Sequence, residues 1–237
     1  MRKFFVLCFM APVMFPLSSF KGIKEEKHPA LYPTIIQYLQ NAEKEFDQIP
    51  ADRKLELKKI ADYVQTKLKE DKKASLIYIC THNSRRSHMG QLWAMAAAEF
   101  YGIKGISSYS GGLEITAFNP NAIKALDEAG FKISKKADAS NPDYESRYSD
   151  NAPPVISFSK KYMDAPNPTS NFIAVMTCSH ADQNCPVVKG ASLKVATPYE
   201  DPKEADGKPN QDDVYRERCK QIATEVLYTF SLINTDK

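Results

Sequence analysis

The sequence has little excess charge and no long apolar run. Its 32 lysines and arginines nearly balance 29 aspartates and glutamates, giving a formal net charge of +3 over 237 residues. Because no basic cluster or aromatic-interleaved basic stripe accompanies this small charge, we predict no nucleic-acid partner. The longest apolar stretch, residues 4–17, is broken by Pro12 and Pro16 and is too short to span a membrane as a helix. Internal repeats are also lacking.

That apolar stretch is typical of a secretory signal peptide. Arg2 and Lys3 precede it, and the small residues Ser18 and Ser19 follow it. We therefore predict that residues 1–19 are a signal peptide and that the protein is exported, to the periplasm. A retained membrane anchor and a cytoplasmic protein are the alternatives.

Cysteine is sparse. Five cysteines occur, and Cys8 lies within the predicted signal peptide. Four thiols in an exported chain would by default indicate two structural disulfides. The pair Cys178 and Cys185 has no further thiol or imidazole at the spacing of zinc ligands, and we predict neither a metal nor a cofactor. The other two cysteines outside the signal peptide are Cys80 and Cys219.

Two amphipathic stretches follow the signal peptide. Apolar residues recur at helical spacing over residues 35–46 and again over residues 57–68, and residues 49–52 break the pattern between them. We predict an N-terminal helical hairpin within residues 20–73, a packing extension on the main domain.

From residue 74 onward, apolar strand patterns alternate with amphipathic helices. This alternation predicts an α/β domain over residues 74–237, a three-layer sandwich with a central, mainly parallel four-stranded sheet and helices on both faces. Segment 138–171 is rich in Asn, Pro, Ser and Asp and is interpreted as a surface excursion. Strands are predicted at residues 76–79, 106–109, 172–177 and 193–197, and residues 155–158 have the pattern of an extra strand.

The first of these strands ends in a candidate oxyanion-binding loop. It has the pattern C-x5-R-S, with the sequence Cys80-Thr81-His82-Asn83-Ser84-Arg85-Arg86-Ser87. Five intervening residues let the backbone curl into a nest of N–H groups around a tetrahedral anion, and the next helix adds partial positive charge. Arg86 can hold two oxygens of the anion, and the same positive field favours the thiolate of Cys80, the predicted nucleophile. Ser87 can donate to that thiolate, and Asn83 can pin the loop. The alternative is that these residues have no catalytic role. Cys80 would then only end a buried strand, and Arg86 would only cap the following helix.

The loop resembles the signature of the low-molecular-weight protein tyrosine phosphatases and of their relatives, the thioredoxin-coupled arsenate reductases. Tyr109-Ser110-x-Gly112 and residues 119–125 resemble the arsenate reductase branch. The resemblance covers roughly residues 74 to 237, without much of segment 138–171. It implies a small oxyanion as substrate, either arsenate or a phosphate ester. The residues implied to bind it are Thr81, His82, Asn83, Ser84, Arg85 and Ser87.

A second motif, Cys178-Ser179-His180-Ala181-Asp182-Gln183-Asn184-Cys185-Pro186, follows the predicted strand 172–177. It is similar to the arsenate reductase segment in which two cysteines pass a disulfide on to thioredoxin. A structural disulfide between Cys178 and Cys185 is the alternative, and an exported protein makes it a serious one.

A third motif is Asp201-Pro202, after the last predicted strand. The family places its general acid in such an Asp-Pro pair, so the resemblance implies that Asp201 protonates the leaving oxygen. An aspartate before proline in an ordinary turn is the alternative.

Together these residues imply reduction of arsenate to arsenite by a monomeric enzyme that depends on a thioredoxin-like reductant. The predicted catalytic residues are Cys80, Arg86, Asp201, Cys178 and Cys185. Hydrolysis of phosphomonoesters through a phosphocysteine is the alternative activity, and a non-catalytic oxyanion-binding or redox-sensing module is the alternative class.

The chain also departs from the family's pattern. His82 replaces a glycine, Arg85 replaces a cysteine that many relatives carry, and Gln91 replaces a glutamate that binds potassium in some arsenate reductases, so no cation is predicted. His88 and His180 are expected to be exposed. Cys219 and Trp93 are expected to lie in the core.

Overall fold

The protein is described by a computed structural model, which covers Met1 and residues 31–234. The predicted signal peptide lies outside the described residues, apart from Met1. No helix in the described part of the chain is long and apolar enough to cross a membrane.

The central sheet has four parallel strands in the order β2-β1-β6-β7. Strands β1 and β6 are buried along almost their whole length, because a parallel sheet is covered on both faces. Cys80, the last residue of β1, pairs with Gly112, and the carboxyl ends of the strands lie at one edge of the sheet. The strands are β1 (Ala74–Cys80), β2 (Ile106–Gly112), β6 (Phe172–Met176) and β7 (Ala191–Ala196).

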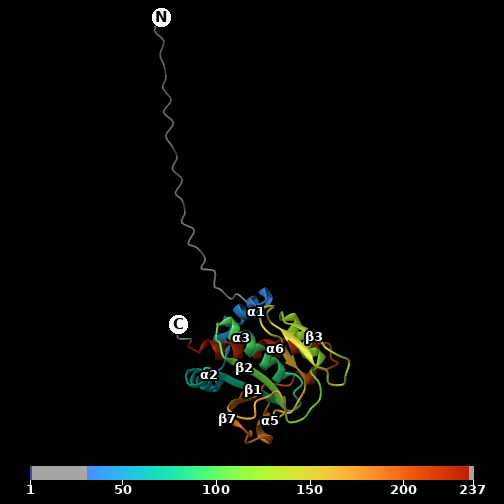
Figure 1. The fold of residues 1–237 in the computed structure, drawn as a ribbon. Helices are drawn as coiled ribbons and strands as arrows, with labels where there is room; N and C mark the ends of the chain where they lie inside the picture. Colours follow the sequence, from blue (N-terminus) through green and yellow to red (C-terminus); the bar gives the residue numbers. More distant parts are fainter. Residues whose placement is uncertain (2–30, 235–237) are drawn as a thin grey trace.

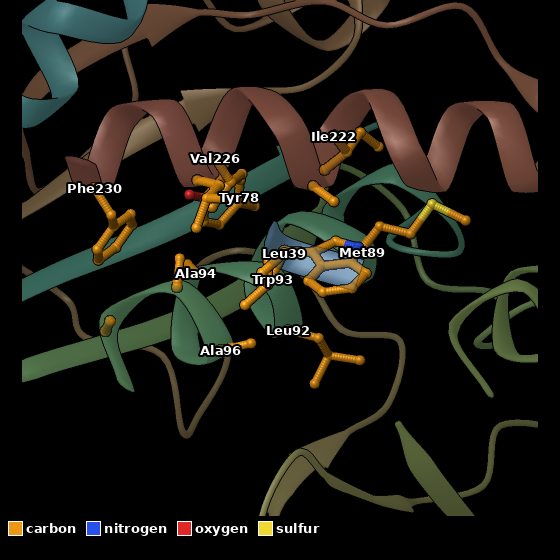
Figure 2. Close-up of a cluster of buried hydrophobic side chains, with 14 of the residues drawn as sticks. Leu39, Tyr78, Met89, Leu92, Trp93, Ala94, Ala96, Ile222, Val226 and Phe230 are labelled. Carbon is orange, nitrogen blue, oxygen red and sulfur yellow. The ribbon is translucent and has the colours of Figure 1, made fainter. Parts of the chain in front are cut away.

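Helices cover both faces of this sheet, so the predicted three-layer α/β architecture is confirmed. The residues of β1 alternate: Leu76 and Tyr78 belong to a large apolar cluster with α2, α3 and α6, whereas Ile77 belongs to a smaller cluster beneath α5. Figure 2 shows Ile222, Val226 and Phe230 projecting from one side of α6 into the large cluster. The helices are α2 (Ala51–Asp71), α3 (Arg86–Phe100), α4 (Pro120–Glu128), α5 (Ser179–Asn184) and α6 (Gln211–Ser231), with the short 3-10 helix η2 (Pro202–Ala205).

The predicted N-terminal helices are present as α1 (Pro33–Glu43) and α2, with the short 3-10 helix η1 (Phe46–Gln48) between them (Figure 1). Pro33 begins α1, and Pro50 precedes α2 as its N-cap. Leu39 of α1 and Ile60 of α2 are buried in the same cluster as Ile222 of α6. The two helices therefore belong to the main core and do not form a separate lobe.

Segment 138–171 is not the surface excursion that its composition predicted. It supplies two strands of a three-stranded antiparallel sheet in the order β3-β4-β5. The predicted extra strand exists, but it pairs with β4 and not with the main sheet. The polar composition of the segment did not indicate that part of it is buried. Ser146 and Ser157 are buried, and their hydroxyls are hydrogen-bonded to each other at 3.4 Å. The strands are β3 (Lys132–Lys135), β4 (Tyr144–Arg147) and β5 (Val155–Ser157).

Trp93 and Cys219 lie in the core, as predicted. The Trp93 ring stacks on Tyr38 at 4.9 Å, and its Nε1–H donates to Cys219 Sγ at 3.4 Å. Burial raises the pKa of the Cys219 thiol to about 12. This cysteine is therefore an unreactive core residue.

Candidate active site

The loop from Cys80 to Ser87 joins β1 to α3 at the carboxyl edge of the sheet. The Cys80 thiol is buried, and its Sγ lies 3.1 Å from Ser87 Oγ. Ser87 lies in the first turn of α3, whose free N–H groups favour negative charge nearby. The sulfur thus has a hydroxyl neighbour that can stabilise a thiolate.

The loop backbone turns its carbonyl groups outward. The carbonyl oxygens of Thr81, His82 and Ser84 accept hydrogen bonds from groups outside the loop, at 2.8 to 3.0 Å. No N–H of residues 81–85 donates to a backbone carbonyl in the described part of the chain, so these groups can converge on an anion. The outside donors are the N–H groups of Leu113, Glu114 and Asn119 and the hydroxyls of Thr116 and Ser159.

Asn83 pins this loop from within. It adopts a left-handed conformation with φ of 44°, whereas His82, at the position of the family's glycine, does not have positive φ. The fully buried Asn83 side chain donates from Nδ2 to Ser87 Oγ at 2.9 Å. Its Oδ1 accepts from the backbone N–H of Lys160, also at 2.9 Å. One amide therefore orients the hydroxyl beside Cys80 and ties the loop to segment 138–171.

Lys160 is a contact of this loop that the sequence did not reveal. Its backbone carbonyl accepts from Gly112 N at 2.9 Å, next to the end of β1. Its side chain is buried, which lowers the pKa of the ammonium group to about 8. No sequence motif marks Lys160. Its contact with the loop depends on how segment 138–171 folds against that loop.

Arg86 joins the oxyanion loop to the predicted acid. Its guanidinium donates to Tyr199 O and to Asp201 Oδ2, both at 2.7 Å. Asp201 also accepts from Lys203 N with its other oxygen, at 3.2 Å, and so begins η2. The Nε of Arg86 is buried without a partner among the described residues. The predicted nucleophile loop and the predicted acid are thus brought to one place.

Arg85 has a different environment. Its Nε donates to Tyr215 OH at 2.8 Å, and its guanidinium lies 3.4 Å from Asp206. Tyr215 belongs to α6 and Asp206 directly follows η2. The side chain therefore braces the loop against α6, while its backbone remains part of the loop.

A cleft of about 680 Å³ opens over the loop. Its lining includes Thr81, His82 and Arg86 from the loop, together with Asp201 and Cys178. His82 lies 3.4 Å from Glu114 at the rim. The cleft therefore brings cationic, anionic and thiol groups together around one oxyanion-sized loop.

Cys178 and Cys185 lie at the two ends of α5, and Cys178 lines this cleft. Cys178 is the N-cap of α5, and its sulfur accepts from Ala181 N at 3.4 Å. It also lies 3.4 Å from the hydroxyl of Thr81. Both cysteines are buried free thiols, and they share an apolar cluster with Cys80. The tertiary fold thus gathers three thiols that are far apart in sequence.

His180 is exposed, as predicted, and its Nδ1 lies 3.1 Å from Thr81 Oγ1. The expectation for His88 was wrong, because this side chain is completely buried. It stacks on Phe118 at 4.1 Å and lies 3.1 Å from Ser110 Oγ. Desolvation holds the pKa of His88 well below its usual value. It is a neutral core residue beneath the loop.

No group of three or more His, Cys, Asp or Glu side chains suited to a metal ion occurs among the residues that the structure describes. Gln91 is buried and donates to Ser108 O at 3.2 Å.

Comparison with known proteins matches this chain to arsenate reductases in sequence, whereas no family model matches it. An arsenate reductase of Bacillus cereus is 30% identical over 132 residues, which are 56% of this chain and 79% of that protein. An arsenate reductase of Bacillus licheniformis is 27% identical over 161 residues, or 67% of this chain and 96% of that protein.

Among solved structures, a mutant of YwlE from Bacillus subtilis covers 67% of this chain and 97% of its own, with 14% identity and a TM-score of 0.46. A low-molecular-weight phosphotyrosine phosphatase from Vibrio cholerae covers 65% of this chain and 93% of its own, with 12% identity and a TM-score of 0.46.

The fold and the sequence relatives define the class: the chain belongs to the superfamily of low-molecular-weight protein tyrosine phosphatases and arsenate reductases. Its family membership implies an enzyme that acts on an oxyanion substrate.

Proposed function

We propose that this protein reduces arsenate to arsenite through Cys80, with Cys178 and Cys185 as a thiol relay. One observation supports this above all: the sulfur of Cys178 lies 3.4 Å from Thr81, the residue next to the nucleophile. A phosphatase needs no second thiol there. The relatives that are named arsenate reductases agree with this choice.

In the first step, the Cys80 thiolate attacks arsenic while the loop N–H groups and Arg86 hold the arsenate oxygens. Arsenate bound to Arg86 competes with Asp201 for the guanidinium, so Asp201 leaves the ion pair, takes up a proton from water and delivers it to the departing oxygen. A sulfur–arsenic bond forms, and water leaves.

In the second step, the Cys178 thiolate attacks the sulfur of Cys80. A disulfide forms, the electron pair of the sulfur–arsenic bond stays on arsenic, and arsenite leaves. Cys185 then attacks Cys178 and releases the Cys80 thiolate. The resulting disulfide between Cys178 and Cys185 is reduced by an external dithiol, for which we propose a thioredoxin-like protein.

The test compares arsenate reduction, supported by thioredoxin, with hydrolysis of a phosphotyrosine analogue. Cys80→Ser should abolish turnover. Cys178→Ser should stop reduction, and Cys185→Ser should allow a single turnover and trap a Cys80–Cys178 disulfide, visible by non-reducing peptide mapping. Asp201→Asn should slow reduction because the leaving oxygen loses its proton donor. Normal reduction in both relay variants would contradict the proposal.

Hydrolysis of phosphomonoesters is the second candidate, and the contact of Arg86 with Asp201 favours it. Ester cleavage needs a group that binds the phosphate anion and a proton donor for the leaving oxygen. Arg86 can bind the anion, and the carboxyl group of Asp201, 2.7 Å away, can donate the proton. In that reaction water resolves a phosphocysteine, and the two distal thiols take no part. Ester hydrolysis without any arsenate reduction in the wild-type protein would select this function.

We also propose that the enzyme is exported after removal of residues 1–19, which lie outside the described residues apart from Met1. Mass spectrometry of the N-terminus of the native protein tests this. An intact N-terminus in the cytoplasmic fraction would contradict export.

A further inference from the structure

The structure places a histidine in a hydrogen-bonded chain that ends at Cys178. The sulfur of Cys178 lies 3.4 Å from Thr81 Oγ1, and the same oxygen lies 3.1 Å from His180 Nδ1. Among the described residues, His180 is the one ionisable side chain other than Cys178 that is bonded to this hydroxyl. A single hydroxyl therefore connects a buried thiol to an exposed imidazole.

Cys178 has to lose its proton before it can attack Cys80, because the thiolate and not the thiol is the nucleophile. A free cysteine thiol, with a pKa of about 8.5, is only a few per cent ionised at neutral pH. Cys178 is 2% exposed, so bulk water has little direct access to its proton. A local acceptor is therefore needed for rapid attack.

From this geometry we propose that His180 is the proton acceptor that activates Cys178, with Thr81 as the connecting hydroxyl. The inference rests on the proposed relay function. The thiol of Cys178 passes its proton to Thr81 Oγ1 while the Thr81 hydroxyl passes its own to His180 Nδ1. The products are a Cys178 thiolate and a doubly protonated imidazolium, so the total charge is unchanged.

The surroundings fit both products. The new thiolate accepts from the Thr81 hydroxyl and from the N–H of Ala181, whose nitrogen lies 3.4 Å from the sulfur. The imidazolium is at the surface of the cleft, where it is solvated and can release its proton to water. His180 therefore acts through Thr81 as a proton acceptor and does not touch the substrate in this step.

The experiment measures the rate at which iodoacetamide alkylates Cys178 at pH 7. A Cys185→Ser background leaves one thiol in the tryptic peptide 162–189, so mass spectrometry reads Cys178 alone. We expect His180→Ala to slow this alkylation about tenfold, because the buried thiol loses its local proton acceptor. Added imidazole should restore the rate. Gln183→Ala, an exposed change on the same helix, should leave it unchanged.

Two further variants separate proton transfer from positioning. In His180→Gln the amide can still accept from Thr81 but cannot take up a proton, so alkylation should remain slow. In Thr81→Val the hydroxyl is missing, so alkylation should be slow and imidazole should not restore it. A wild-type rate in His180→Ala, His180→Gln or Thr81→Val would overturn the proposal, as would a slow His180→Ala protein that imidazole fails to rescue.

The same variants are then followed through one arsenate turnover in the Cys185→Ser background, by the appearance of the Cys80–Cys178 disulfide. Formation of this disulfide should slow by the same factor as alkylation. If the wild-type protein never reduces arsenate but His180 still controls alkylation of Cys178, the proposed function fails and the proton path stands. If arsenate is reduced equally fast with and without His180, the proton path fails and the function stands.

Discussion

Asn83 shows how much of the site depends on single side chains. Its amide orients Ser87, which is the neighbour of the Cys80 sulfur, and also holds the backbone of Lys160. Its left-handed φ of 44° is a conformation that asparagine tolerates better than most residues. The residue thus combines a conformational role with two buried hydrogen bonds.

Replacing Asn83 separates these roles. Asn83→Ala should lower turnover strongly and destabilise the fold by about 2 kcal/mol, since two buried hydrogen bonds are lost. Asn83→Gly should lose the same activity but recover roughly 1 kcal/mol of stability, because glycine adopts positive φ without strain. Urea unfolding and initial rates measure both effects. Equal stability of the two variants would show that the left-handed conformation carries no strain.

At the scale of the elements, Arg53 links helix α2 to residues 198–201, the segment that ends in Asp201. Arg53 donates to Pro198 O at 2.5 Å, and its guanidinium lies 5.3 Å from the centre of the Tyr199 ring. The buried carboxylate of Glu225 lies 3.5 Å from Arg53 Nε. Because the Tyr199 carbonyl accepts from Arg86, the N-terminal extension supports the segment that presents Asp201.

We predict that Arg53→Met misplaces Asp201 and slows the protonation of leaving groups. With aryl phosphates as probes, the loss should be about tenfold for a poor leaving group and much smaller for p-nitrophenolate, which leaves without a proton. Lys58→Met, an exposed change on the same helix, is the control. A uniform loss for both esters would indicate a general structural defect and contradict the prediction.

The proposed relay requires helix α5 to open. The six residues of α5 lie between Cys178 and Cys185, and seven helical rises place their Cα atoms about 10 Å apart, whereas a disulfide requires Cα atoms within about 7 Å. Lys194 of β7 opposes this opening, because its Nζ donates to the carbonyls of Asp182 and Cys185 at 2.9 and 2.8 Å. It also lies 2.8 Å from Asp182 Oδ1. These contacts stabilise the helical, reduced form.

Lys194→Met should therefore favour the disulfide between Cys178 and Cys185. We expect its equilibrium constant against glutathione to rise about threefold to tenfold, since a few partly exposed hydrogen bonds are lost. Lys189→Met, an exposed change nearby, should have no effect. An unchanged redox equilibrium in Lys194→Met would mean that these contacts persist when the helix opens.

At the scale of the whole molecule, buried ionisable groups link stability to pH. The pKa of Lys160 falls to about 8 in the fold from its ordinary 10.5, because burial outweighs attraction by Asp143 and Asp164. Between these two pH values the unfolded chain binds more protons than the folded one. By linkage, this lysine makes the fold more stable as pH rises from 8 to 10.5.

Lys160→Met should remove that contribution. We expect the slope of unfolding free energy against pH to be lower in the variant between pH 8 and 10, by up to about 1.4 kcal/mol per pH unit. Comparison with the wild type cancels the opposing effect of Cys219, whose raised pKa makes the fold less stable above its ordinary range. Identical slopes would mean that the ammonium group stays charged in the fold.

The local sequence determined the elements and the nucleophile loop. Continuous apolar runs at β1 and β6, helical periodicity in α1 and α2, and C-x5-R-S at the end of a strand are properties of neighbouring residues, so they can be read without a fold. The burial of Trp93 and Cys219 followed from their place on apolar helix stripes. The family resemblance indicated Asp201 as the general acid, whereas its contact with Arg86 came from the structure.

Only the tertiary structure decided which distant residues meet. Lys160 and Arg53 carry no local signal, because each acts through contacts with segments far away in the chain. Lys194 contacts α5, 9 and 12 residues earlier, through backbone carbonyls that no side-chain pattern reveals. His88 was misjudged because a buried neutral imidazole and an exposed one look alike in sequence. The chain from His180 through Thr81 to Cys178 joins residues 97 and 99 positions apart, and folding of the parallel sheet brings them together. Strand ends that are remote in sequence meet at one edge of that sheet, so the fold and not the local pattern assembles the proposed relay.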